Sequence, residues 1–193
     1  IYGSQHVPYI EEETKIDPLN YYGLSKANME HYVNRFLNHK KDCIAIALRY
    51  CNVYGFGEFH KNNRASMIYQ MLFKKIFNIP VNLFEDGNQK RDWVYVDDVV
   101  QANYLASKFD KSEAFNVGSG VATSFNELSS IMELQKLNLV NYVPCPFQKE
   151  YQTHTLCGLE KINKLLGYKP KDDIKTNIIN LEKKLRDHFK MPN

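Results

Sequence analysis

The 193-residue chain lacks several features that would assign it to a class at once. No run approaches the roughly 18 apolar residues that a membrane-spanning helix needs, so no membrane partner is predicted. The formal charge is only +3, from 25 Lys and Arg against 22 Asp and Glu, which is too small to favour nucleic acid. The chain also contains no internal repeat or low-complexity tract. With 44% hydrophobic residues, it has the composition of an ordinary globular domain.

Metal-binding and redox patterns are also absent. The sequence contains four cysteines: Cys43, Cys51, Cys145 and Cys157. None forms a C-x-x-C pair, and none stands at metal-ligand spacing with a histidine, so no metal site is predicted. Cys43 and Cys51 lie in or beside apolar runs, where a reduced cysteine behaves as a small hydrophobic residue. We therefore expect reduced thiols and a cytoplasmic protein.

Helical and strand patterns alternate along the chain, which predicts an α/β fold. Helices are expected at residues 21–38, 65–77, 97–109, 124–137, 159–166 and 174–189, and strands at 44–48, 81–84, 93–96, 114–117 and 141–143. Ser124 and Glu127 have the spacing of a capping box, and Asp97 is the expected N-cap of its helix. A loop that contains Gly55 and Gly57 is expected between the first strand and the second helix.

Tyr22 and Lys26 stand four residues apart at the start of the first expected helix, a spacing that places both on one face. A cation beside a phenol favours the phenolate, so this pair can supply a base. The spacing alone is weak evidence, because Tyr104 and Lys108 repeat it midway along another expected helix. Tyr22 differs in its context, since it follows a loop containing Pro18 and can point into a cleft.

Four segments carry a family resemblance, in order along the chain: PLNYYGLSK at 18–26, LRYCNVYG at 48–55, FEDGNQKRDWVYVDDV at 84–99 and FNVGSG at 115–120. Together they resemble the extended short-chain dehydrogenases, which include the nucleotide-sugar epimerases and dehydratases. The resemblance implies a doubly wound Rossmann-like domain that carries a smaller α/β substrate-binding domain. Residues 1–55 would be the C-terminal part of the dinucleotide-binding domain. Residues 56–193 would mainly form the substrate-binding domain, with segments near 92–110 returning to the Rossmann sheet.

The family binds its dinucleotide on a Gly-rich loop near the N-terminus, and this chain has no G-x-G-x-x-G pattern. Gly118-Ser119-Gly120 does not continue into one. The chain therefore resembles the C-terminal part of such an enzyme. Its start at Ile1, without Met, adds to the expectation that a segment precedes it.

Residues 58–61 with 65–67, and the stretches 142–144 and 150–155, resemble one subfamily, the ADP-glycero-manno-heptose 6-epimerases. This resemblance implies a cytoplasmic homo-oligomer that inverts C6 of the heptose in lipopolysaccharide core precursor synthesis. Inversion would proceed by oxidation to a ketone and return of the hydride, with NADP as cofactor and NAD as the alternative. The other readings are a UDP-hexose 4-epimerase or a dTDP-hexose 4,6-dehydratase that uses NAD. A reading of another class is a non-catalytic fragment that binds a sugar nucleotide.

The same resemblance implies roles for individual residues. Tyr22 would take the hydroxyl proton, Lys26 would assist it and hold the nicotinamide ribose, and Lys61 would be a second acid/base. The cofactor-binding set is Tyr22, Lys26, Val53 and Lys61. The substrate-binding set is Asn52, Asn63, Gln70, Phe84, Glu85, Asp86, Gly87, Arg91 and Tyr151. Arg91 suits a diphosphate because a guanidinium binds two oxygens at once. The competing readings are a solvated loop lysine for Lys61, a surface ion pair with Asp92 or Asp86 for Arg91, and a core aromatic for Tyr151.

Overall fold

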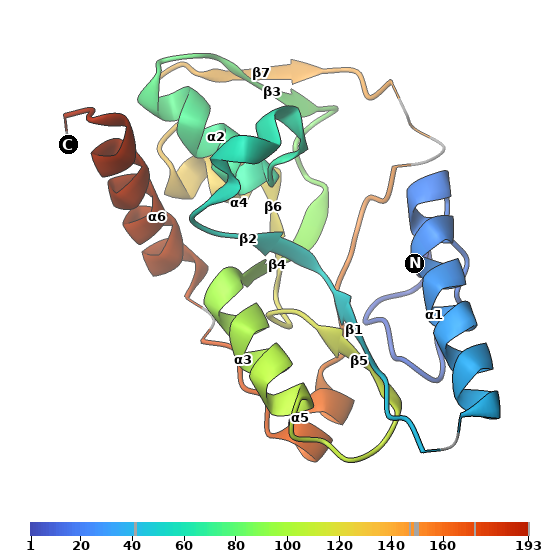
Figure 1. Cartoon of the computed structure of the whole chain (residues 1–193). Helices are drawn as coiled ribbons and strands as arrows, with labels where there is room; N and C mark the ends of the chain where they lie inside the picture. The colour runs from blue at the N-terminus through green and yellow to red at the C-terminus, as the bar shows by residue number, and fades with distance from the viewer. Residues whose placement is uncertain (41, 147, 149–150, 172, 193) are drawn as a thin grey trace.

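The computed structural model describes residues 1–40, 42–146, 148, 151–171 and 173–192, and in it helices alternate with strands (Figure 1). The helices are α1 Tyr21–His39, α2 Met67–Ile76, α3 Val96–Ala106, α4 Phe125–Ile131, α5 Glu160–Leu166 and α6 Ile174–Phe189, with a 3-10 helix, η1, at Glu58–Arg64. The strands are β1 Ile46–Tyr50, β2 Asn52–Tyr54, β3 Val81–Phe84, β4 Lys90–Tyr95, β5 Glu113–Val117, β6 Ala122–Ser124 and β7 Val140–Val143. These elements confirm the predicted α/β class. None of the described helices combines the length and hydrophobicity that crossing a membrane requires.

The sequence pattern misses three short elements and misplaces two helix ends. The strands β2 and β6 and the helix η1 were not expected. The predicted N-cap at Asp97 is wrong, because Tyr95 caps α3 and Asp97 lies in its first turn, where a carboxylate interacts favourably with the helix dipole. The predicted end of α4 near residue 137 is also wrong, since Glu133 and Asn138 have positive φ angles of 57° and 54°. The capping box that begins α4 at Ser124 is confirmed.

Parallel strand pairs connected through helices dominate the fold, as expected for α/β topology. β1 pairs with β5 in register from Ile46↔Glu113 to Tyr50↔Val117. The chain continues from β1 through one residue, Cys51, into β2, which pairs in parallel with β4, and β4 pairs antiparallel with β6. β3 and β7 form a separate parallel pair at the top of Figure 1. The direct passage from β1 to β2 places Cys51 between the two sheets, with Asn52 and Val53 at the start of the second.

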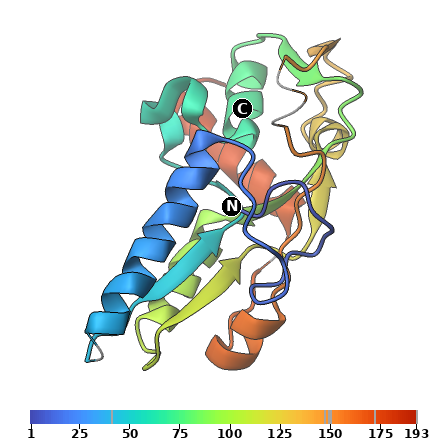
Figure 2. The same ribbon diagram turned by 90° about the vertical axis from the view of Figure 1, so that its right-hand side faces the viewer.

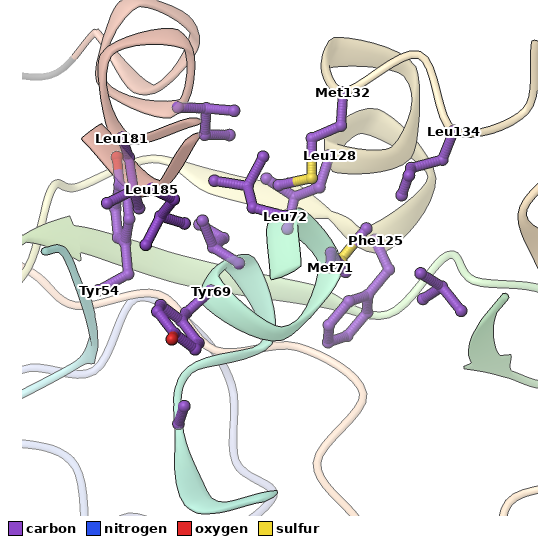
Figure 3. Packing of buried hydrophobic residues seen from close by; sticks show 14 of the residues in the cluster. Tyr54, Tyr69, Met71, Leu72, Phe125, Leu128, Met132, Leu134, Leu181 and Leu185 are labelled. Atoms are coloured by element: carbon purple, nitrogen blue, oxygen red, sulfur yellow. The ribbon is translucent and has the colours of Figure 1, made fainter. Parts of the chain in front are cut away.

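Two hydrophobic clusters support these sheets. The larger one brings α2, α4 and α6 onto β3 and β4. Figure 3 shows its side chains from α2 (Met71, Leu72), from α4 and the residue after it (Leu128, Met132) and from α6 (Leu181, Leu185). The smaller cluster contains Ala102, Phe115, Val117, Ile162 and Tyr168 and joins α3, β5 and α5. We propose that the smaller cluster belongs to the dinucleotide-binding domain and the larger one to the substrate-binding domain.

The expectation of four reduced thiols is wrong for this structure. Cys51 and Cys157 form a disulfide, whereas Cys43 and Cys145 are free. The bond joins two segments separated by 106 residues, the β1–β2 junction and the chain that leads into α5. A pairing at this distance along the chain depends on tertiary structure, and the spacing of the cysteines in the sequence carries no signal for it.

Helix α1 lies along one side of the β1–β5 pair, and the N-terminal loops run beside them (Figure 2). None of its residues is buried, so apolar packing alone does not hold it. Its main polar link is Glu30, which accepts hydrogen bonds from Nε (3.0 Å) and Nη2 of Arg49 on β1. Arg49 also donates to the Tyr2 hydroxyl at 2.6 Å. Burial lowers the pKa of Arg49, but its contacts with Glu30 and Tyr2 outweigh burial and raise that pKa above its ordinary value.

The variant Arg49→Met is therefore expected to lower the free energy of unfolding by about 3 kcal/mol, because it leaves a largely buried carboxylate without its partner. The side chains of Arg49 and Glu30 are only 12% and 14% exposed. The control is Lys136→Met, which breaks an ion pair with Glu133 whose side chains are 77% and 57% exposed. That change should cost less than about 1 kcal/mol. Urea unfolding measures both, and equal losses would contradict the role given to Arg49.

Candidate active site

A cavity of about 1230 Å³ lies between α1, β1, β2 and η1. Its wall contains seven of the predicted site residues: Tyr22, Lys26, Asn52, Val53, Lys61, Arg91 and Tyr151. These residues come from five segments of the chain, and the fold brings them to one place. The cavity extends along β1 and past its carboxyl end, which is the edge of a parallel sheet where α/β proteins bind ligands.

The start of α1 sets the position of the Tyr22–Lys26 pair. Asn20 is the N-cap, and its side chain accepts a hydrogen bond from the Gly23 N–H at 2.9 Å. A Cβ at Gly23 would lie 3.0 Å from the Cβ of Pro18, so the close approach of the preceding loop favours glycine here. One turn later, the Lys26 ammonium lies 5.3 Å from the ring centroid of Tyr22. Tyr22 is 73% exposed and borders the cavity.

Tyr104 of α3 and Lys108 just after this helix have the same spacing as Tyr22 and Lys26, and comparing the two pairs shows how they differ. Lys108 Nζ donates to the Tyr104 hydroxyl at 2.5 Å and lies 3.9 Å from the centroid of its ring. This contact is closer than that of Tyr22 with Lys26, yet both Tyr104 and Lys108 lie outside the cavity wall. Spacing and mutual contact therefore do not distinguish the two pairs. They differ in position, because Tyr22 and Lys26 border the cavity.

Arg91 is buried in the cavity wall, with 7% of the residue exposed. Its guanidinium carbon lies 4.9 Å from the ring centroid of Tyr151, and Nη1 donates to the backbone oxygen of Lys90 at 2.8 Å. Burial lowers the pKa of Arg91. Among the described residues, no carboxylate forms an ion pair with it, so the surface ion pair with Asp92 or Asp86 does not occur. A buried cation without an anionic partner suits an anionic ligand.

Tyr151 lies between Arg91 and Phe84 of strand β3. Its ring makes an edge contact with Phe84, with the ring centroids 5.5 Å apart. Burial raises the pKa of Tyr151, with a smaller opposite effect of the Arg91 charge. Tyr151 thus covers the guanidinium on one side while bordering the cavity.

Six predicted substrate residues do not line the described cavity: Asn63, Gln70, Phe84, Glu85, Asp86 and Gly87. Gln70 donates from Nε2 to the backbone oxygens of Asn63 and Ala65, at 3.2 and 2.7 Å, and so ties the end of η1 to α2. Asp86 accepts hydrogen bonds from the backbone and side chain of Asn88. These contacts give the residues a structural role, and their substrate contacts stay a prediction.

The turn after β3 is held against α4. Gly87 has φ 72°, and a Cβ there would lie 2.4 Å from Oδ1 of Asn126. The Asn126 amide donates to the backbone oxygen of Asp86 at 2.8 Å. Glu85 accepts from the backbone N–H of Cys145 at 2.8 Å. The turn is therefore shaped by its own side chains and by its neighbours.

Sequence reasoning missed several cavity residues, including Tyr2, Tyr9, Glu58 and Gln152. Tyr9 donates to the Gly3 carbonyl at 3.0 Å, and Gln152 donates to the Tyr9 hydroxyl at 3.2 Å. Burial raises the pKa of both Tyr2 and Tyr9. Glu58 and Gln152 had a signal in the sequence, because they belong to the 58–61 and 150–155 stretches that carry the subfamily resemblance.

Cys51, Asp92 and Cys157 form a group with ligand atoms close enough to hold a metal ion. The two sulfurs are bonded to each other. The Asp92 carboxylate accepts four hydrogen bonds, from the Ser119 N–H and hydroxyl and from the N–H groups of Gly120 and Cys157. Burial nevertheless raises the pKa of Asp92. These contacts account for the group as a structural link across β4, β5 and the segment before α5.

Known proteins match this chain along most of its length. It is 32% identical over 185 residues to ADP-L-glycero-D-manno-heptose-6-epimerase of Brachyspira hyodysenteriae, covering 92% of this chain and 58% of that protein. The crystal structure of ADP-L-glycero-D-manno-heptose-6-epimerase from Helicobacter pylori is 38% identical and superposes with a TM-score of 0.82, over 96% of this chain and 57% of that one. UDP-glucose 4-epimerase of Thermotoga maritima, solved with UDP-glucose, is 27% identical with a TM-score of 0.75, over 87% and 54%.

The chain therefore spans somewhat more than half the length of these relatives. Residues 1–118 match the model of the NAD dependent epimerase/dehydratase family. This range contains the Tyr22–Lys26 pair, the β1–β5 pair, η1 and Arg91. With the match over more than half of its residues and a relative of known fold at 38% identity, the chain belongs to the NAD dependent epimerase/dehydratase family.

Proposed function

We propose that the protein containing this chain is an NADP-dependent epimerase that inverts C6 of the heptose in ADP-glycero-manno-heptose. The observation that carries the proposal is the presence of Lys61 on the wall of the same cavity as Tyr22 and Lys26. Inversion of a secondary alcohol through a ketone presents the oxygen in two positions, so two acid/base groups on one cavity serve it. The similarity to two ADP-heptose epimerases supports this substrate.

The residues at the cavity fit the nicotinamide end of a dinucleotide. Lys26 offers an ammonium for the ribose hydroxyls, and Val53 offers an apolar surface beside the carboxyl end of β1. The cofactor supplies the hydride acceptor and donor when bound. This chain has no G-x-G-x-x-G loop, so its own residues would hold the nicotinamide ribose of the dinucleotide and not the diphosphate of that cofactor. NADP is preferred to NAD because of the subfamily resemblance.

The protein's residues would bind the sugar nucleotide and move protons. Arg91 would bind the diphosphate, and Tyr151 would cover it. Tyr22 would accept the hydroxyl proton on one face of the sugar carbon, with the Lys26 ammonium 5.3 Å from the centroid of its ring. Lys61 would exchange a proton with the alcohol oxygen in its second position. Asn52 would contact the substrate beside Val53.

The assay that tests this function uses the protein purified from its native source, whose intact mass is measured first. A mass above 22.6 kDa would show further chain and allow a complete cofactor site. We then expect epimerisation of ADP-glycero-manno-heptose and none of UDP-galactose. Activity on UDP-galactose alone would favour a UDP-hexose 4-epimerase, which the similarity to the Thermotoga maritima enzyme supports. A mass of 22.6 kDa with binding but no turnover would favour the non-catalytic binding fragment.

Cytoplasmic location and self-association belong to the same proposal. Nucleotide sugars and nicotinamide dinucleotides are cytoplasmic metabolites, so an enzyme that uses both would work in the cytoplasm. The exposed apolar side chains of α1, among them Leu24, Tyr32 and Phe36, support a homo-oligomer.

A further inference from the structure

We propose that Glu58 is a positioning residue for Lys61, holding the ammonium toward the cavity; this role rests on the proposed function. Glu58 begins η1, and its Oε2 lies 3.4 Å from Nζ of Lys61, three residues along the chain. Both residues line the cavity. The pair differs from an ordinary surface ion pair because the carboxylate is buried: the Glu58 side chain is 7% exposed, against 46% for Lys61.

Glu58 is fixed from two further sides. Its Oε2 accepts a hydrogen bond from the backbone N–H of Ser66 at 2.8 Å, and Oε1 accepts from the Ser66 hydroxyl at 2.7 Å. Oε1 also accepts from the Gly55 N–H at 3.3 Å, at the end of β2. Ser66 is itself the N-cap of α2. The carboxylate therefore has one rotamer held by two elements, and a charge held in this way directs a mobile ammonium better than a free surface carboxylate would.

The negative charge of Glu58 acts on a neighbouring side chain, Tyr69. Burial, and next the charge of Glu58, raise the pKa of Tyr69 on α2. No other cation is paired with Glu58 among the described residues, so Lys61 is the group that balances it. Because a buried carboxylate without a positive partner is costly, the carboxylate and the ammonium stabilise each other in this position.

The backbone around Lys61 is unusual for the residues it contains. Asn62 has φ 50° and ψ −128°, inside η1, and Gly57 before the helix has φ 102°. Residues other than glycine rarely adopt the backbone conformation of Asn62. Such conformations cluster at functional sites, where the surrounding structure enforces them. Here the hydrogen bonds of Glu58 to Ser66 and Gly55 close η1 at both ends. Glu58 thus determines both the direction of the Lys61 side chain and the shape of the segment that carries it.

The test compares Glu58→Gln with Glu133→Gln in the protein from its native gene. Glu133 forms the same i,i+3 pair with Lys136 on the surface, outside the cavity. We expect E58Q to lower kcat for epimerisation about tenfold and to change KM less than twofold. E133Q should change neither constant, because that pair is exposed.

A second readout does not depend on turnover. Acetic anhydride acylates accessible amines, and loss of the ion pair frees the Lys61 side chain, so E58Q should raise the rate of Lys61 acetylation at pH 8 about threefold, measured by peptide mass spectrometry against Lys108. Should E58Q fail to fold, Glu58→Asp keeps the charge but shortens its reach; we expect lower kcat with KM changed less than twofold.

The outcomes separate the two proposals. If wild-type protein epimerises ADP-heptose but E58Q retains full kcat and unchanged acetylation, the role of Glu58 is overturned and the function stands. Full kcat in E58D would overturn it equally. A wild-type protein that leaves ADP-heptose unchanged while E58Q accelerates acetylation of Lys61 would overturn the proposed function, and with it the catalytic purpose of the pair.

Discussion

A Tyr22→Phe variant is expected to lose about 10³-fold in kcat for epimerisation, because it removes the hydroxyl that exchanges the substrate proton and keeps the ring. The KM for the sugar nucleotide should change little, since the proposed diphosphate contact comes from Arg91 on β4. The fold should be unaffected: Tyr22 is 73% exposed and no structural hydrogen bond of the described chain uses its hydroxyl. Steady-state kinetics of the protein from its native gene measure both constants.

The matched control is Tyr104→Phe. Tyr104 has the same spacing to a lysine and makes a closer contact with it, but it lies on α3 away from the cavity. Its variant should keep wild-type kcat. Comparable losses in the two variants, or full activity in Y22F, would rule out Tyr22 as the proton acceptor.

This pair of tyrosines also shows how much of the site the sequence could predict. A Tyr and a Lys four residues apart lie on one face of any helix, so this spacing also occurs by chance. In the sequence, only the loop before Tyr22 indicated that its side chain borders a cleft. The regular elements were predictable for the same local reason. Runs of apolar residues marked β1, β3 and β5, and the Ser124–Glu127 pair marked the start of α4.

Long-range contacts were beyond local patterns. The Cys51–Cys157 bond joins segments 106 residues apart, and β2 and β6 are three-residue strands that exist only because β4 lies between them. The resemblance likewise did not show which of the assigned substrate residues border the cavity. Arg91 and Tyr151 reach the cavity, whereas the turn at residues 84–87 is held by α4 and lies outside the cavity wall. A motif identifies the family position, and the packing around it decides what each side chain faces.

A Lys61→Met variant is expected to lose about 10³-fold in kcat for epimerisation while Tyr22 remains able to act on its own face of the sugar. Methionine has a similar length and no proton to exchange, so it removes the chemistry at a side chain that is 46% exposed, and Glu58 keeps its hydrogen bonds from Ser66 and Gly55. The variant should therefore retain oxidation, to the ketone, of the isomer that Tyr22 serves, with the hydride passing to the bound nicotinamide, observed as a partial reaction without inversion. Loss of the partial reaction together with inversion would indicate a disrupted cavity.

The control for Lys61 is Lys108→Met, which removes an exposed lysine outside the cavity. If Lys61 were a solvated loop residue, the two methionine variants would behave alike and keep wild-type kcat. The proposed two-base inversion requires the opposite result, because one group on one side of the carbon cannot reach the oxygen in both positions. Equal rates in K61M and K108M, measured with ADP-glycero-manno-heptose at saturating concentration, would therefore reject the assignment of Lys61 and leave Tyr22 as the single acid/base of the site.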